Sequence, residues 1–189
     1  MQSSITLSNW EVVSNPAFPV TLAHQDHGRS DFIIGTPSSK PVGVYTADCL
    51  PLVLTTDTKA FAIHISRHTL TAGILEELTK SIDNEKIRDA YIGPHICENC
   101  FVFEEQGEGI QQFEKIFSYA VHKDTLGTHI SLISVIENYL RKQDFDISAI
   151  IQDNRCTLET PILPSYRRWR AEGENGDFPR IITAVFTKT

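Results

Sequence analysis

Two histidines and one cysteine near the start of the chain are residue types that bind zinc. His27 ends a strand-like segment, Cys49 follows Asp48 in the sequence TADC, and His64 lies in the strand-like sequence AIHIS. Imidazole and thiolate are the usual zinc ligands, and three protein ligands leave the fourth tetrahedral position open to water. An open zinc site lowers the pKa of its bound water to about 7 and so creates a nucleophile. These three residues therefore indicate a candidate catalytic zinc site.

Spacing by itself does not distinguish this site from simpler alternatives. The three residues are 22 (27 to 49) and 15 (49 to 64) positions apart, which matches no local zinc motif such as CxxC or HExxH. A cysteine in an apolar run is commonly a small buried hydrophobe. A metal-free alternative also stays open, in which His64 activates the Cys49 thiol as a nucleophile.

Strand-like segments dominate the first third of the chain and must position these residues. Their Val, Ile, Thr and Phe content and their Pro, Gly, Asp and Ser boundaries are typical of strands. The predicted strands span residues 4–7, 10–13, 20–25, 31–36, 41–56 and 60–66. Residues 57–59 are predicted to form a hairpin connection between the last two.

Helical periodicity appears later in the chain. Apolar residues at three- and four-residue intervals predict a helix over 69–82, with Thr69 or Thr71 as N-cap. Further helices are predicted over 107–117 and 128–143, strands over 89–94, 100–105, 147–153 and 180–187, and a loop over 159–179. Strands and helices mix without strict βαβ alternation, which favours a single α+β domain over residues 1–189.

Composition limits the classes of partner. The net charge of −7 argues against nucleic-acid binding, although the cluster at 167–170 (RRWR) is suited to one anionic ligand. The sequence lacks an apolar run long enough for a membrane span and a recognisable secretory signal. We therefore expect a cytoplasmic protein with its four cysteines reduced.

Six motifs resemble, in order, those of the laccase-domain family: HQDHG, TADCLPLVL, AIHISRH, YIGPHICENCFVF, NRCT and PSYRRWR. That family is also described as multicopper polyphenol oxidase-like, and its YfiH-like members as zinc-dependent purine nucleoside phosphorylases. The resemblance runs from about Thr21 to the C-terminus. Its zinc ligands, carried over by position, fall on His27, Cys49 and His64.

The resemblance implies both a fold and a reaction. The fold is α+β, with mixed sheets packed in layers and helices outside. The cofactor is zinc, the substrates are a purine nucleoside and phosphate, and the reaction is phosphorolysis of the N-glycosidic bond, with adenosine deamination as a second activity. Asp48 is then a catalytic residue that orients a neighbouring group, as groups around zinc ligands do.

This chain departs from the family pattern at residues that are expected to bind the substrate. Where the family has HAGWRG, this chain has HISRHT, so Arg67 replaces the tryptophan and His68 the arginine. An arginine is always charged, whereas a histidine is mostly neutral at pH 7. We expect Arg67, His68 and Arg168, the last in the SYRR motif, to bind substrate. The altered segment also leaves open a paralogue that binds zinc or a nucleoside without turnover.

The cysteines and the methionine bear on two other chemistries, blue-copper binding and thiol redox chemistry. A blue-copper site needs a weak axial ligand such as Met. The only methionine is Met1, so a copper oxidase is the least favoured of the alternatives. Cys97 and Cys100 form a CxxC pair without a second CxxC. We interpret them as structural or pocket-lining thiols, with a redox role as the alternative.

Overall fold

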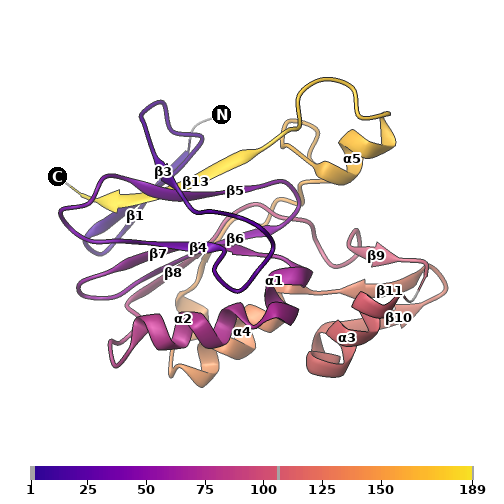
Figure 1. Ribbon diagram of the computed structural model, residues 1–189, viewed down its shortest axis with the longest axis horizontal. Helices are drawn as coiled ribbons and strands as arrows, with labels where there is room; N and C mark the ends of the chain where they lie inside the picture. Colours follow the sequence, from indigo (N-terminus) through magenta and orange to yellow (C-terminus); the bar gives the residue numbers. More distant parts are fainter. Residues whose placement is uncertain (1–2, 106, 189) are drawn as a thin grey trace.

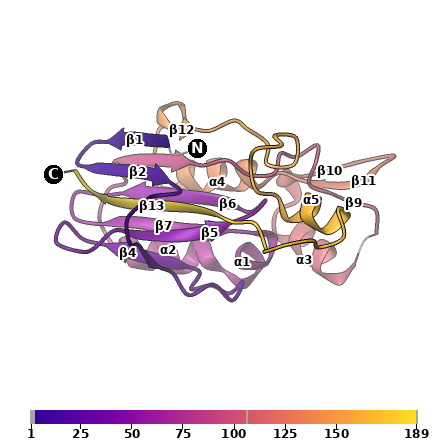
Figure 2. The same cartoon turned by 90° about the horizontal axis from the view of Figure 1, so that it is seen from above.

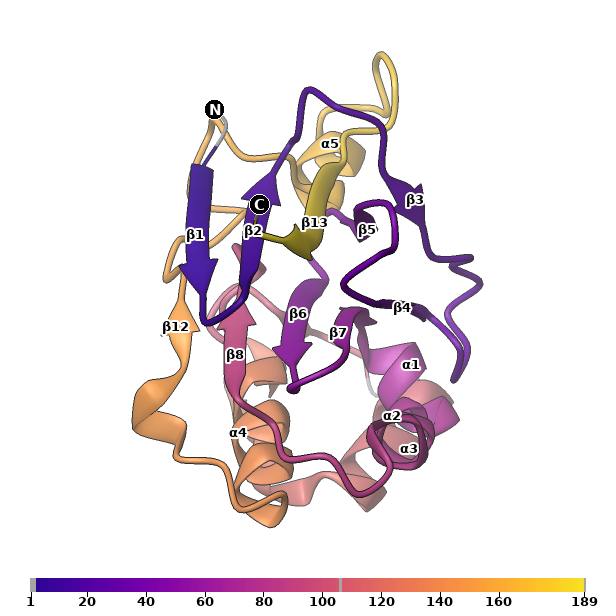
Figure 3. The same ribbon diagram turned by 90° about the vertical axis from the view of Figure 1, so that its left-hand side faces the viewer.

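The computed structural model describes residues 3–105 and 107–188, so the expected domain over 1–189 includes residues 1, 2, 106 and 189 outside the described part. Two five-stranded sheets lie one above the other, and helices cover the outer face of the second (Figures 1 and 3). A three-stranded sheet stands at one end of this sandwich. The α+β class predicted from the sequence is confirmed.

The first sheet has the order β1-β2-β13-β5-β3 and is seen from above in Figure 2. Its strands are β1 (Ser3–Leu7), β2 (Trp10–Ser14), β13 (Ile181–Thr187), β5 (Val42–Thr46) and β3 (Thr21–Leu22). β3 pairs parallel to β5, and the other neighbours are antiparallel. A Cβ on Gly43 would lie 2.7 Å from the carbonyl oxygen of Thr183, so glycine permits the close approach of β5 to β13.

The second sheet has the order β12-β8-β6-β7-β4 and is buried between the first sheet and the helices. Its strands are β12 (Ile151–Gln152), β8 (Asp89–Ile92), β6 (Leu50–Thr55), β7 (Ala60–Ile65) and β4 (Phe32–Gly35). Every position of β6 and β7 is buried, which explains why both read as continuous apolar runs. Their antiparallel pairing ends at Thr55 and Ala60 and confirms the predicted hairpin.

The predicted strand over 41–56 is two strands in different sheets. β5 ends at Thr46 in the first sheet and β6 begins at Leu50 in the second. Asp48, in the crossing segment, has φ 78°, a left-handed conformation that a non-glycine residue adopts at a cost. The apolar pattern predicted both strands but not the break between them.

The helix layer differs from the prediction in its boundaries. The helix predicted over 69–82 is α1 (Arg67–Ala72) followed by α2 (Ile74–Ile82), separated at Gly73 with φ 93°. Ser66 is the N-cap, and Thr69 completes a capping box with it, so the prediction of Thr69 or Thr71 as N-cap was wrong. Among residues 3–105 and 107–188, no helix has the length and apolar character needed to cross a bilayer.

The remaining elements also correct several boundaries. The predicted helix 128–143 is strand β11 (Gly127–Ile130) followed by α4 (Leu132–Lys142), because residues 127–130 pair with a neighbouring strand. The predicted strand 147–153 begins as a 3-10 turn, η2 (Ile147–Ala149), and the predicted loop 159–179 contains α5 (Tyr166–Ala171), N-capped by Ser165. The other elements are β9 (Val102–Phe103), α3 (Glu108–Ile116), η1 (Ser118–Ala120) and β10 (Val121–Asp124).

Candidate metal centre and substrate cavity

A cavity of about 670 Å³ lies where the ends of β5 and β7 meet α1, α5 and β9. These elements come together at one end of the sandwich, toward the right of Figure 1. This volume is in the range of small-molecule sites. The lining residues are Ala23, His24, Gln25, His27, Tyr45, Thr46, Ala47, Asp48, Cys49, His64, Ser66, Arg67, His68, Ile96, Phe101, Phe103, Tyr166, Arg167, Phe178 and Arg180.

His27 is held in a turn organised by one buried carboxylate. The side chain of Asp31 is fully buried and accepts hydrogen bonds of 3.1 Å from the backbone amides of Asp26, His27 and Gly28. His27 itself has φ 62°. Gln25 anchors the turn to β5, because its side chain bonds both the N–H and the C=O of Tyr45, each at 2.8 Å. The left-handed conformation of His27 is therefore maintained by its surroundings.

The same carboxylate orients His64. Asp31 Oδ2 lies 2.9 Å from His64 Nδ1, and both side chains are buried. Because Nδ1 is engaged by a carboxylate, Nε2 is the ring nitrogen left for a metal, which is the usual arrangement around zinc-bound histidines. Asp31 is not among the site residues predicted from the sequence. The available signal was an acidic residue at the start of an apolar strand, four positions after a candidate ligand.

The pKa values of His64 and His27 are shifted in opposite directions. Burial lowers the pKa of His64, but its hydrogen bonds with Asp31 and Cys49 outweigh burial and raise that pKa above its ordinary value. Burial raises the pKa of Asp31, yet the hydrogen bonds from His64 and the Asp26 amide bring it below its ordinary value. Burial and the nearby His64 lower the pKa of His27, which favours the neutral imidazole that ligates metals.

The positions of the two histidines fit a shared metal ion. The ligand atoms of His27, Asp31 and His64 all lie within 4.8 Å of one another. Zn–N bonds of about 2 Å at tetrahedral angles would set two imidazole centroids roughly 5 Å apart, and those of His27 and His64 are 5.2 Å apart. In the described structure Cys49 forms a hydrogen bond with His64 and is not a member of this close group.

Asp48 uses its carboxylate to join separate segments. Oδ1 accepts a 2.6 Å hydrogen bond from the Thr157 hydroxyl, and Oδ2 a 2.8 Å bond from the backbone N–H of Arg167. Its backbone carbonyl accepts the Ile96 amide at 2.9 Å. Asp48 thus connects the turn that carries Cys49 to the start of α5 and to the segment after β8.

The arginines predicted to bind substrate lie in different surroundings. Arg67 and His68 line the cavity, with Arg67 Nη2 2.9 Å from His68 Nε2. Burial, followed by the charge of Arg67, lowers the pKa of His68. Arg168 is outside the set of lining residues. It donates to the carbonyls of a neighbouring loop, those of Thr157, Leu158, Pro161 and Leu163.

Arg167, the residue before Arg168, lines the cavity. Its guanidinium carbon lies 5.1 and 4.9 Å from the ring centroids of Phe101 and Phe103. Nη1 donates to the carbonyls of Cys100 and Val102 at 3.1 and 2.9 Å. The helical turn of α5 separates the two adjacent arginines, so only the first reaches the cavity.

Comparison with known proteins shows the family. Residues 10–185 match the family described as "Multi-copper polyphenol oxidoreductase laccase". Since this match covers most of the chain, the chain belongs to that family. A protein of Aquifex aeolicus (strain VF5) named purine nucleoside phosphorylase is 27% identical over 142 residues, 74% of this chain and 65% of that protein. The matched chain thus spans slightly less than two thirds of that relative.

Solved structures share the fold at low sequence identity. Neisseria meningitidis protein NMB0706 superposes with a TM-score of 0.75 at 17% identity, covering 98% of this chain and 99% of that one. Bacillus licheniformis YfiH gives 0.70 at 16% identity, over 89% and 74% of the two chains. YlmD from Geobacillus stearothermophilus gives 0.72 at 15% identity, over 90% and 74%.

Proposed function

We propose that this protein is a zinc-dependent enzyme that acts on purine nucleosides, cleaving the N-glycosidic bond with phosphate and also deaminating adenosine. The pairing of His27 with His64 at the wall of a large cavity, with Cys49 beside His64, carries this proposal. The name of the Aquifex relative supports the choice of substrate class. A cytoplasmic location remains a prediction from the sequence.

His27, Cys49 and His64 would hold the zinc, which when bound supplies a Lewis acid and a source of nucleophilic water. Asp31 keeps a proton on His64 Nδ1 and so directs Nε2 toward the metal position. Asp48 positions the turn that carries Cys49 through its bonds to Thr157 and Arg167.

Cationic and aromatic side chains provide complementary surfaces for the two substrates. Arg67, Arg167 and Arg180 line the cavity and suit the charge of phosphate. The aromatic lining residues offer flat apolar surfaces for a purine ring: Tyr45, Phe101, Phe103, Tyr166 and Phe178. In phosphorolysis a phosphate oxygen bonds to C1′ of the ribose while the C1′–N bond breaks, and the departing purine nitrogen takes up a proton.

The test is a product assay on zinc-loaded protein with adenosine, inosine, guanosine or methylthioadenosine, each with and without phosphate. Free base and ribose 1-phosphate formed only with phosphate support phosphorolysis, and inosine with ammonia from adenosine supports deamination. His27→Ala should abolish both, whereas His122→Ala, at an exposed histidine of β10, should not. Absence of product from every substrate would overturn the proposal and favour a binding protein without turnover.

A metal-free hydrolase is a second candidate, because Cys49, His64 and Asp31 also lie in the order of a nucleophile, a base and an orienting acid. This candidate predicts activity that survives a chelator and is lost on alkylation of Cys49. Activity that the chelator removes and zinc restores would reject it.

A further inference from the structure

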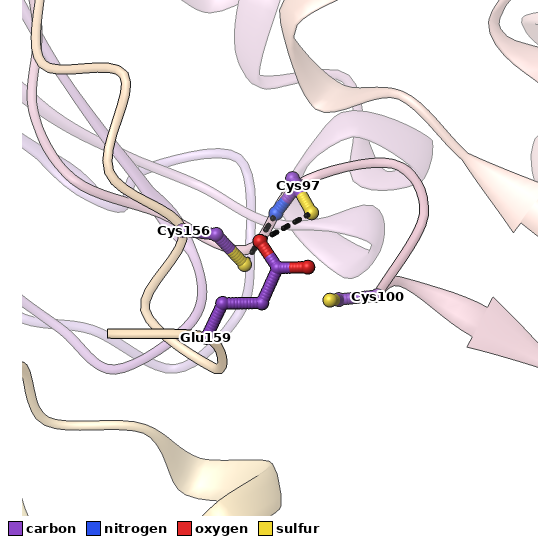
Figure 4. A group of neighbouring side chains, drawn as sticks. All are labelled: Cys97, Cys100, Cys156 and Glu159. Carbon is purple, nitrogen blue, oxygen red and sulfur yellow. Dashed lines mark hydrogen bonds between the residues drawn. The ribbon is translucent and has the colours of Figure 1, made fainter. Parts of the chain in front are cut away.

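A second group of ligand-type side chains lies apart from His27 and His64. The ligand atoms of Cys97, Cys100, Cys156 and Glu159 all lie within 4.8 Å of one another, and in Figure 4 these side chains point toward one another. Two loops supply them: the one after β8 carries Cys97 and Cys100, and the one after β12 carries Cys156 and Glu159. Among the described residues, this cluster supplies the partners that the isolated CxxC lacked in the sequence.

The backbone around the cluster directs the sulfur atoms inward. The amides of Cys100 and Phe101 donate to the carbonyl of Cys97 at 3.1 and 2.9 Å, which folds the CxxC into a tight turn. The Cys97 amide donates to Cys156 Sγ at 3.3 Å. Amide donors at a sulfur stabilise negative charge on it. Glu159 Oε2 lies 3.9 Å from Cys97 Sγ.

The spacing of the four side chains matches a tetrahedral zinc site. With Zn–S bonds of about 2.3 Å, tetrahedral ligands lie about 3.8 Å apart. Because the four ligand atoms lie within 4.8 Å of one another, each pair needs to approach by at most about 1 Å. Soft thiolate ligands select zinc over magnesium or calcium. Four protein ligands leave no open position for substrate, which is the property of a structural zinc site.

We propose that Cys97, Cys100, Cys156 and Glu159 form a second metal site, which binds zinc and fastens together the two loops behind the cavity. On binding, the three thiols release their protons and coordinate as thiolates.

The cluster is connected to the cavity through neighbouring residues. Ile96, next to Cys97, donates its amide to the carbonyl of Asp48, and Thr157, next to Cys156, donates its hydroxyl to the Asp48 carboxylate. The carbonyl of Cys100 accepts from Arg167. A metal ion that fixes the two loops would therefore also fix the turn that carries Cys49 and the position of Arg167.

The test is the number of zinc ions per chain, measured by elemental analysis on full-length protein purified with a reductant. We expect two ions in the wild type, one in Cys49→Ala, one in Cys156→Ser and none in the double variant. Glu159→Gln should weaken zinc binding at this site by at least the roughly 10- to 100-fold that loss of a group supporting a ligand costs. Glu98→Gln, at an exposed carboxylate in the same loop, is the matched control and should keep both ions.

The outcomes separate this site from the proposed catalytic one. A single ion that is lost in Cys49→Ala and kept in Cys156→Ser would overturn the second site and leave the first intact. A single ion with the reverse pattern would support the second site and remove the basis of the proposed function.

Cobalt substitution gives an independent reading, because thiolate-to-cobalt absorption must fall strongly in Cys156→Ser. If Cys156→Ser fails to fold, Cys97→Ser at the partly exposed position replaces it. A disulfide among these thiols in the isolated protein would overturn the proposal.

Discussion

The carboxylate of Asp31 and the imidazole of His64 form a buried hydrogen bond of 2.9 Å across 33 positions of the chain. The same carboxylate accepts the amides of the turn that carries His27. One fully buried acidic residue thus positions both histidines, His64 through its side chain and His27 through its backbone.

Asp31→Asn should weaken zinc binding at the cavity site by roughly 10- to 100-fold. The Asn side chain has one acceptor oxygen, whereas the carboxylate accepts hydrogen bonds from the imidazole and from three backbone N–H groups. The substitution should also lower the free energy of unfolding by about 1 to 3 kcal/mol. Chelator competition in the Cys156→Ser background would measure the affinity, and urea unfolding the stability.

Asp57→Asn is the matched control for this substitution, because Asp57 forms an exposed ion pair with Arg88. It should change zinc affinity little. Equal zinc affinity in Asp31→Asn and Asp57→Asn would show that Asp31 does not orient the ligands.

Asp48 combines an unfavourable backbone conformation with two side-chain hydrogen bonds. Asp48→Ala and Asp48→Gly both remove the bonds, but only alanine keeps the left-handed strain. We expect alanine to be less stable than glycine by about 1 kcal/mol. Urea unfolding of the two variants checks this difference, and equal stabilities would mean that the turn relaxes when the carboxylate is removed.

Arg167 and Arg168 should differ in what their loss affects. Arg167→Met removes a cavity-lining charge, so the KM for phosphate should rise by roughly 10- to 100-fold, the value of a hydrogen bond to a charged group. It also removes the donor to the Cys100 and Val102 carbonyls, so Tm should fall as well. Arg168→Met removes the hydrogen-bond donor to several loop carbonyls. It should therefore mainly lower Tm, by about 4 to 8 °C. Steady-state kinetics and thermal unfolding of both variants make the comparison. The opposite result, with KM raised by Arg168→Met and not by Arg167→Met, would identify Arg168 as the binding residue.

Zinc should stabilise the folded chain. Added to chelator-stripped protein at about 100 times Kd, it should contribute about 2.7 kcal/mol per site, which raises Tm by roughly 5 to 10 °C. Magnesium, which prefers oxygen ligands, should give no such shift. Thermal unfolding with each ion checks this, and equal effects of the two would argue against thiolate sites.

The sequence by itself determined the α+β class, most of the buried strands and the hairpin between β6 and β7. These follow from local apolar patterns that the backbone converts directly into elements. Residue type and family resemblance also singled out His27, Cys49 and His64, and the structure brings the two histidines together with Cys49 next to His64.

Tertiary structure alone decided the contacts between segments distant in the chain. Residues 128–130 are predicted from the sequence as the start of a helix, but pairing with β10 places them in β11. Arg167 rather than Arg168 reaches the cavity because α5 begins at a hydrogen bond to Asp48. Asp31 beside His64, and Cys156 with Glu159 beside the CxxC, depend on loops that only folding brings together. Local sequence carries propensity and periodicity, whereas these pairings depend on the packing of the whole chain.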